Sequence, residues 1–235
     1  MIGRNHLPFL AIVVWLTAGD FEASRELLFS SAQTIAYTQS TSSCTAFSSI
    51  AGQGTKLDVG HGIDPTIAVT LVTPFNFLGT RDEPVLTITQ DGTINLGNVA
   101  ECAMSGITPI VDDATSTVSY DHVPRISVSQ ATGSKPIPSS VGSGVYHLDK
   151  GSSNVFSWEL VSIGYSRMSY QAELFENGDI EMRYDYLGSY AQMLTVTVGV
   201  EDESLGVAFP KDGCPDGVCS GFPQSSCVRF TVVSP

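Results

Sequence analysis

The stretch YQAELFENGDIEMRY, residues 170–184, encodes a β-hairpin. Apolar and polar residues alternate on both sides of Asn177 and Gly178, which is the period of a half-buried strand. A two-residue turn there would place the apolar residues of the two strands on opposite faces. A three-residue loop from Glu176 to Gly178 puts them on one face, and Gly178 takes the left-handed position of a type I turn with a G1 bulge. The predicted pairs are Leu174 with Ile180, Ala172 with Met182 and Tyr170 with Tyr184.

The same design occurs earlier in the chain, in VLTITQDGTINLG, residues 85–97. A loop at residues 90–92 pairs Ile88 with Ile94 and Leu86 with Leu96, while Thr87 meets Asn95 on the other face. Two hairpins of one design predict an antiparallel all-β fold. We expect a β-sandwich of jelly-roll or lectin-like type, with few or no helices after the N-terminal segment.

The chain divides into three predicted parts. Residues 1–19 have the pattern of a secretory signal peptide: Arg4 gives the positive charge, residues 7–16 are apolar, and small residues precede Asp20. The alternative is a membrane anchor, which needs about 20 apolar residues. A leader follows at 20–55, and the sandwich is predicted for 56–235, including a cysteine-bearing loop and a last strand. Further strands are predicted near 68–72, 85–89, 93–96, 125–128, 145–148, 155–161 and 194–200.

The composition is that of an acidic folded protein. The formal net charge is −13, while 42% of the residues are hydrophobic and 15% are charged. Such a charge is repelled by nucleic-acid phosphates and anionic lipid, so neither is an expected partner. The hydrophobic content argues against disorder. No other segment is long enough to span a membrane, and the expected location is extracellular.

Five cysteines, an odd number, indicate disulfides in a secreted chain. Cys214, Cys219 and Cys227 lie close together, and a bridge from Cys214 to Cys219 is the favoured local pair. Cys227 is then left for a more distant cysteine or a partner chain. Cys44 and Cys102 flank the first hairpin and are candidates to tie the N-terminal segment to the sheet, or to be buried thiols.

Catalytic patterns are weak in this sequence. It has no Gly-x-Ser-x-Gly elbow and no His-Glu-x-x-His pair. Glu159, Glu173 and Glu181 fall on predicted strands and could form the carboxylate pair of a glycosidase, but acids on a sheet are ordinarily a solvated face. We therefore do not expect an enzyme.

Two kinds of binding residue are candidates. Asp112, Asp113, Glu201, Asp202 and Glu203 fall in predicted loops, where oxygen ligands bind calcium in extracellular sandwiches, although plain solubilising charge is the alternative. No other cofactor is indicated. Tyr165, Tyr186 and Tyr190 are candidates for a sugar-stacking platform. Tyr184 and Tyr186 share one face with Met182, which also fits core packing, and Trp158 alternates with apolar neighbours as a core residue does.

Several motifs together carry a family resemblance. They occur in the order TPFNFLG (73–79), LTITQDGTINLG (86–97), VPRISV (123–128), GVYHLDKGSSNVFSWELV (144–161), YQAELFENGDIEMRYDYLG (170–188) and TVTVGVED (195–202). In this order they resemble the β-sandwich modules of large secreted and surface proteins of bacteria and protists, and more distantly nidogen-type extracellular domains. Such modules have a Trp-x-Asp run after the Pro-Arg strand, where this chain has SVSQATGSK. The resemblance implies an extracellular module.

These observations lead to two hypotheses of function. The first is a secreted, non-catalytic structural or adhesive module, a subunit of an extracellular coat, appendage or matrix. Its partners would be other surface proteins or further copies of the chain. The alternative is a carbohydrate-binding module, assisted by calcium.

Overall fold

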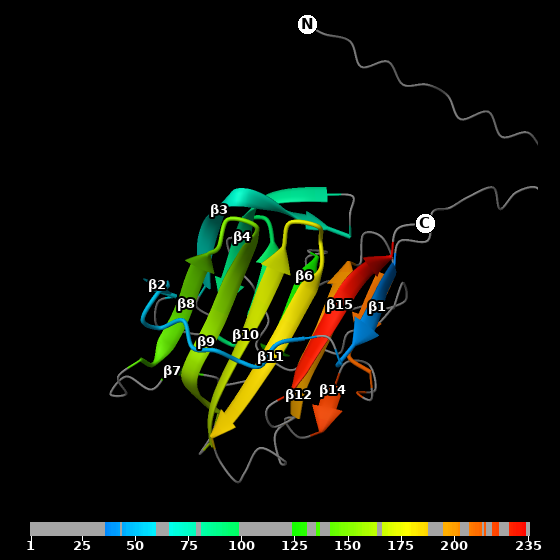
Figure 1. The fold of residues 1–235 in the computed structure, drawn as a ribbon. Helices are drawn as coiled ribbons and strands as arrows, with labels where there is room; N and C mark the ends of the chain where they lie inside the picture. Colours follow the sequence, from blue (N-terminus) through cyan, green and yellow to red (C-terminus); the bar gives the residue numbers. More distant parts are fainter. Residues whose placement is uncertain are drawn as a thin grey trace, which may run out of the picture. The chain divides into compact units, whose positions relative to one another are not determined.

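The computed structural model describes the part of the chain in which the sandwich lies. The described residues are 36–42, 44–59, 66–78, 81–98, 124–130, 135–136, 142–163, 166–187, 195–202, 207–212, 214, 218–220 and 226–233. They form strands and connecting turns, with no helix among them. The fold is an all-β sandwich of two antiparallel sheets, as the sequence predicts (Figure 1).

The first sheet has eight strands within the described residues. From one edge to the other they are β1 (Ala36–Ser40), β15 (Cys227–Val233), β11 (Ile180–Leu187), β10 (Ser166–Phe175), β9 (Ser153–Ile163), β8 (Gly144–Asp149) and β2 (Thr55–Leu57), and β7 (Lys135–Pro136) also pairs with β9. Neighbouring strands run antiparallel throughout. The N-terminal and C-terminal strands of the described chain therefore lie side by side at one edge.

The second sheet has seven strands within the described residues. Their order is β13 (Val207–Pro210), β12 (Thr195–Asp202), β6 (Arg125–Gln130), β5 (Thr93–Leu96), β4 (Arg81–Thr89) and β3 (Thr66–Phe77), and β14 (Val218–Ser220) also pairs with β12. This sheet is antiparallel as well.

Both predicted hairpins have the predicted register. Leu174 pairs with Ile180, Ala172 with Met182 and Tyr170 with Tyr184; Leu86 pairs with Leu96, Thr87 with Asn95 and Ile88 with Ile94. Gly178 and Gly92 have φ angles of 90° and 99°, the left-handed conformation that the three-residue loops require. The N–H of Phe175 donates to the Asp179 carbonyl over 2.9 Å, which closes the predicted loop. Register and turn geometry are thus confirmed at both sites.

The core lies between the inner faces of the two sheets, and buried aromatic residues join them. Trp158 is fully buried, as predicted, and stacks on Tyr170 with ring centroids 5.3 Å apart. Its indole N–H donates to the Thr89 carbonyl of the opposite sheet over 2.9 Å. The Tyr184 hydroxyl donates to the Val128 carbonyl of that sheet over 2.9 Å. Trp158 and Tyr184 therefore fill the core with their rings, while their polar tips donate to backbone carbonyls of the other sheet.

Several strands were not predicted from the sequence. These are β1, β2, β7, β13 and β14, each of five residues or fewer. β1 lies in the segment assigned to a leader, yet it pairs with β15 and belongs to the first sheet. Tyr37 on β1 is buried and packs edge-on against Phe230. The sandwich therefore includes part of the segment 20–55.

Candidate functional site

A polar segment, residues 44–54, crosses the outer face of the eight-stranded sheet, and we call it the strap (Figure 1). It is fixed in turn to β15, β11, β10 and β9, and it then continues as β2 beside β8. The attachments are the disulfide from Cys44 to Cys227, two hydrogen bonds from Thr45 to Glu181, one from Gln171 to the Ser48 carbonyl, and two from Ser49 and Ile50 to Glu159. The order of the attachments follows the order of the strands in the sheet.

Glu159 holds the middle of the strap. Its Oε1 accepts the Ile50 N–H over 2.7 Å and the Ser157 hydroxyl over 3.1 Å, and its Oε2 accepts the Ser49 hydroxyl. The residue is only 4% exposed. A charged acceptor makes strong hydrogen bonds when it is buried among several donors. Glu159 therefore serves as the shared acceptor for this part of the strap.

A β-bulge directly follows Glu159. The register between β9 and β10 shifts so that Glu159 and Leu160 both face Ser169, and Leu160 has a φ angle of 51°. Ser169 stabilises this geometry because its Oγ accepts the Leu160 N–H over 3.0 Å. The additional residue lets Trp158 and Val161 both face the core while Glu159 points to the strap.

A second group of charged residues lies under the start of the strap. Glu181 Oε1 accepts the N–H and hydroxyl of Thr45 over 2.9 and 2.8 Å, and the Arg183 Nε over 2.7 Å. Arg183 also donates to Gln171 Oε1 over 2.9 Å and forms an ion pair with Glu173. Glu181, Arg183, Gln171 and Glu173 are each at most 6% exposed. The single guanidinium thus binds three acceptors from two strands.

Further cations surround the same group. Lys150 and the Ser153 hydroxyl donate to Glu173 Oε1 over 3.0 and 2.6 Å. Arg229 on β15 pairs with Asp179 over 2.8 Å and lies 3.5 Å from Glu181. A buried carboxylate is stable only when charges and donors compensate it, and both conditions hold here.

The two glutamates next to Arg183 are held in the ionised form. Burial raises the pKa of Glu181, but the hydrogen bonds from Thr45 and Arg183 outweigh burial, so the pKa lies below its ordinary value. In Glu173, burial is likewise outweighed by Ser153, Arg183 and Lys150, and the pKa is lowered. A general acid for glycoside hydrolysis needs the opposite shift.

The expectation of a solvated acidic face was wrong for these glutamates. Glu159, Glu173 and Glu181 lie on neighbouring strands, as predicted, but each is at most 5% exposed. The strap crosses this side of the sheet and uses Glu159 and Glu181 as its acceptors, while Glu173 is bonded to Lys150, Ser153 and Arg183. The acids therefore bind the chain's own backbone and side chains.

Two disulfides are present among the described residues. Cys214 is bonded to Cys219, the favoured local pair. Cys227 is bonded to Cys44, 183 positions away in the sequence, which is the more distant partner that the sequence allowed. Cys44 thus ties the N-terminal segment to the sheet, through β15. Cys102 lies outside the described residues.

The candidate calcium ligands are only partly described. Glu201 and Asp202 are the last residues of β12, so the prediction that they lie in a loop was wrong. Both are buried, at 5% and 2% exposure, and Glu201 forms an ion pair with Arg125. Asp112, Asp113 and Glu203 lie outside the described residues. Within those residues, no group of three or more His, Cys, Asp or Glu side chains is placed to hold a metal ion.

The candidate sugar-binding tyrosines lie largely outside the described part of the chain. Tyr165 and Tyr190 are not described, and of Tyr186 only the backbone is, which pairs with Met168 in β10. Its neighbour Tyr184 is fully buried in the core, and burial raises the pKa of its hydroxyl. The stacking platform stays a prediction.

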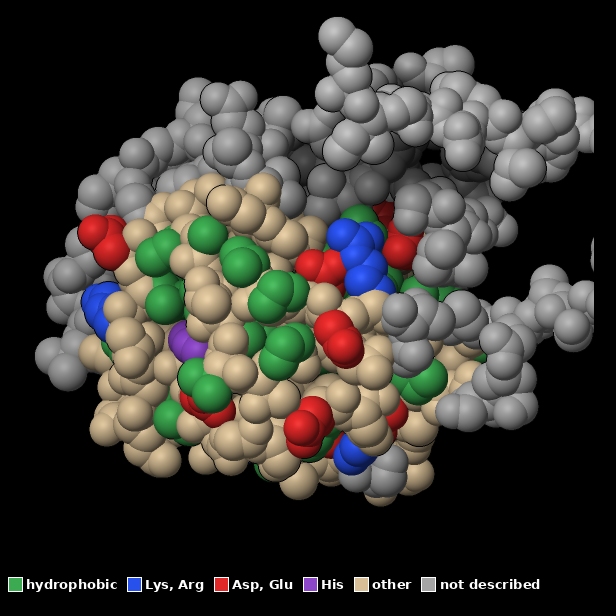
Figure 2. Space-filling view, turned by 90° about the horizontal axis from the view of Figure 1, so that it is seen from above, with side chains coloured by type: hydrophobic (Ala, Val, Ile, Leu, Met, Phe, Trp, Pro, Cys, Tyr) green, Lys and Arg blue, Asp and Glu red, His purple; other side chains and the backbone are tan. Residues whose placement is uncertain are grey.

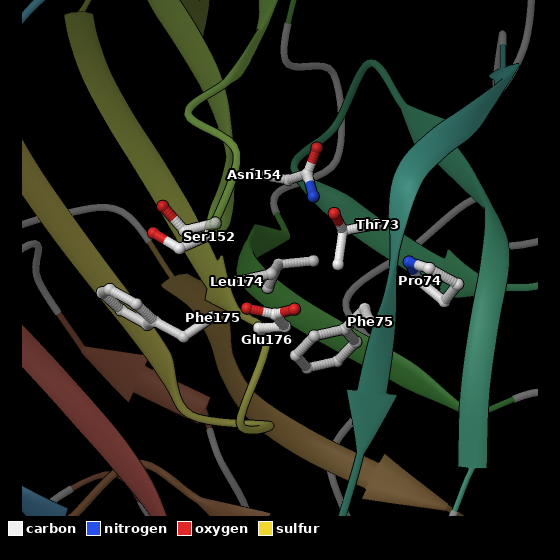
Figure 3. A pocket seen from close by; sticks show the side chains of 9 residues that line it. Thr73, Pro74, Phe75, Ser152, Asn154, Leu174, Phe175 and Glu176 are labelled. Atoms are coloured by element: carbon white, nitrogen blue, oxygen red, sulfur yellow. The ribbon is translucent and has the colours of Figure 1, made fainter.

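A shallow depression lies at one end of the sandwich (Figure 3). It is lined by the second half of β3, the β8–β9 turn with the start of β9, and the end of β10 with the hairpin loop that follows: Thr73, Pro74, Phe75, Ser152, Ser153, Asn154, Leu174, Phe175 and Glu176. The Thr73 hydroxyl donates to the Gly151 carbonyl over 3.2 Å. The depression has no enclosed space for a water molecule, so it offers no built ligand site.

The sequence did not indicate that residues 44–54 cross the sheet. It also did not indicate that Arg183 is the central cation of the charged group beneath them. Thr45, Ser48 and Ser49 belong to a polar run without periodicity, which gives no signal of a partner. The available signal was on the sheet, where Gln171, Glu173, Glu181 and Arg183 share one face of the predicted hairpin. Arg183 lies there beside two glutamates that face each other directly across the strands, and like charges in that position are destabilising unless a cation compensates them.

Comparisons with known proteins identified no relative of this chain. Within the described residues, no helix is long and apolar enough to cross a membrane. No family model, no curated protein and no solved structure matches this chain.

Proposed function

We propose that the chain is a secreted, non-catalytic structural or adhesive module, a subunit of an extracellular coat, appendage or matrix. The observation that carries the proposal is the strap, which binds four neighbouring strands and joins the sheet itself as β2. A cross-strand tie of this kind resists the separation of strands, which is the property that an extracellular building unit needs.

The chemistry of the buried acids supports the same proposal. Glu159 and Glu181 accept hydrogen bonds from the strap, and Glu173 is paired with Arg183 and Lys150. Glu173 and Glu181, whose pKa values are lowered by these partners, are poor proton donors at neutral pH. The outer face of this sheet is therefore used for cohesion.

The disulfides support the extracellular location. Disulfides form and persist in oxidising compartments, and both of those described close onto the sandwich, one at the strap and one beside β12. The predicted signal peptide, residues 1–19, points the same way. Secretion would place the module where such bonds remain oxidised.

Turnover measurements test the proposal directly. The purified protein is incubated with panels of glycosides, peptides and esters, next to the single variants Glu159→Gln and Glu173→Gln. We expect no turnover above that of the variants. Turnover by the wild type that disappears in one of the folded variants would reject a non-catalytic role. The native mass of the secreted protein then shows whether it is built into an assembly, when it is compared with the mass of one chain without residues 1–19, which is below the 25.0 kDa of the full chain.

A further inference from the structure

The edge strand β3 differs from the other edges of the sandwich. It has twelve residues and pairs with β4 on one side, and on its other side no described strand lies next to it. The other edge strands, β1, β2 and β13, have five, three and four residues, and β13 ends in Pro210. Short strands and proline are the usual means by which proteins prevent pairing at an edge. The first half of β3 has neither protection.

The regular part of β3 is residues 66–70. These pair with residues 85–89 of β4 without interruption, and the register shifts only after Thr70, where Pro74 follows. Ala68 and Thr70 are exposed on the outer side, while Val69 is buried toward the core. A regular strand of five residues with no described neighbour on its outer side can pair with a further strand through its backbone N–H and C=O groups.

This edge carries no charge in a strongly acidic protein. β3 contains no ionisable side chain, although the chain has a net charge of −13. Val72, just beyond the regular part, is 84% exposed. Seen from above, the described surface at this end of the sandwich has a group of hydrophobic side chains with charged ones around it (Figure 2). Two copies of the chain can meet along β3 without bringing carboxylates together.

The sequence of this edge indicates which partner fits it. Residues 66–70 read TIAVT, and in the reverse direction TVAIT, so β-branched or small residues occupy equivalent positions both ways. In an antiparallel pair of two such strands, Ala68 lies opposite Ala68 of the second copy and Thr66 lies opposite Thr70. A two-fold interface needs this self-complementarity. Threonine pairs and β-branched pairs are favourable across strands.

We propose that the chain self-associates through β3, with residues 66–70 of two copies paired antiparallel so that their seven-stranded sheets become continuous. The proposal rests on the structural role proposed above and names its partner as a second copy of the chain. The row of Thr66, Ala68 and Thr70, in which Ala68 and Thr70 are exposed, then lines up across the two-fold axis on one face of the joined sheet.

Charge variants at the axis test the pairing. Sedimentation velocity over a range of concentrations measures association of the wild type, of Ala68→Lys and of Ala68→Glu. Like charges then face each other across the axis, so each variant alone associates up to about fivefold more weakly than the wild type. An equimolar mixture of the two variants restores association, because the introduced lysine of one copy faces the introduced glutamate of the other only in this register.

The controls separate edge pairing from net charge and from misfolding. Gln53→Lys adds the same charge at an exposed turn outside β3, and it associates as the wild type does. Thr70→Lys lies on the same exposed row of β3 but faces Thr66 of the second copy, so it weakens association less than Ala68→Lys does. A wild type that is monomeric at every concentration, or an Ala68→Lys protein that associates as the wild type does, would overturn the pairing. Neither of these association results changes the expected turnover. The turnover measurement therefore tests the proposed non-catalytic role separately.

Discussion

Ile50 donates its backbone N–H to Glu159 over 2.7 Å, although 109 positions separate the two residues in the sequence. The bond joins a segment without regular structure to the middle of a sheet strand. Ile50 is itself buried against Tyr146 and Val155. Its side chain is therefore held by apolar packing, while its backbone N–H is held by the Glu159 carboxylate. This point anchors the strap between its disulfide and its entry into β2.

Replacing Glu159 by glutamine tests this anchor. The amide keeps one acceptor oxygen, but its NH₂ group faces donors and the negative charge is lost. We expect the free energy of unfolding to fall by about 1–3 kcal/mol, as measured by urea denaturation. Glu176→Gln, at an exposed position of the hairpin loop, is the matched control and leaves stability unchanged. Equal stability of both variants would mean that the anchor contributes nothing.

Gly178 at the tip of the β10–β11 hairpin is expected to tolerate no side chain. Its φ angle is 90°, and a Cβ built on it would lie close to the Asn76 carbonyl of β3, in the opposite sheet. Gly178→Ala therefore combines a left-handed conformation, which costs about 1–2 kcal/mol, with a backbone clash. Gly151→Ala has a similar φ angle of 84° and open space around the Cβ, so only the conformational cost remains.

Thermal or urea unfolding of the two alanine variants separates these effects. Gly178→Ala is expected to be clearly less stable than Gly151→Ala. If the two variants lose the same stability, the approach of β3 to the hairpin tip is not a tight contact.

The hairpins could be predicted from the sequence, and the strap could not, for physical reasons. Alternation and Gly178 together restrict the register to one choice, because a slip by one residue turns every side chain to the other face. The strap residue Thr45 has no such restriction, since its partner Glu181 is specified only by the folded sheet. The choice of Cys44 as the partner of Cys227 is equally non-local, because residue spacing does not encode it.

The paired glutamates give the stability a defined dependence on pH. The pKa values of Glu173 and Glu181 are lowered from the ordinary value of 4.5 in the folded protein, so the unfolded chain binds protons more readily. Their contribution is complete above the unfolded pKa and is lost as the pH falls through the lower folded values. We expect the free energy of unfolding to decrease below about pH 5, where the ordinary carboxyl groups begin to bind protons.

Denaturation curves at several pH values check this dependence. Glu181→Gln removes one of the two groups, so it is less stable than the wild type at neutral pH and loses less stability on acidification. Glu176→Gln again serves as control and keeps the wild-type slope. An unchanged slope in Glu181→Gln would show that its pairing with Thr45 and Arg183 is not linked to folding.

The two disulfides are expected to contribute very differently to stability. The bond between Cys44 and Cys227 closes a loop of 183 positions, and the bond between Cys214 and Cys219 closes a loop of five. In the chain-entropy description, a longer closed loop restricts the unfolded state more, by about 5 kcal/mol against about 2 kcal/mol here. The long bond also holds the first attachment of the strap, beside the two hydrogen bonds from Thr45 to Glu181.

Paired serine variants measure the difference under identical conditions. Cys44→Ser with Cys227→Ser is expected to lose about 3 kcal/mol more than Cys214→Ser with Cys219→Ser, by urea denaturation of the folded proteins. Limited proteolysis gives an independent measurement, because the first pair of changes releases the start of the strap, and cleavage within residues 44–54 becomes faster. The second pair leaves the strap attached and keeps the wild-type cleavage rate. Equal losses of stability together with equal cleavage rates would mean that hydrogen bonds alone hold the strap on the sheet.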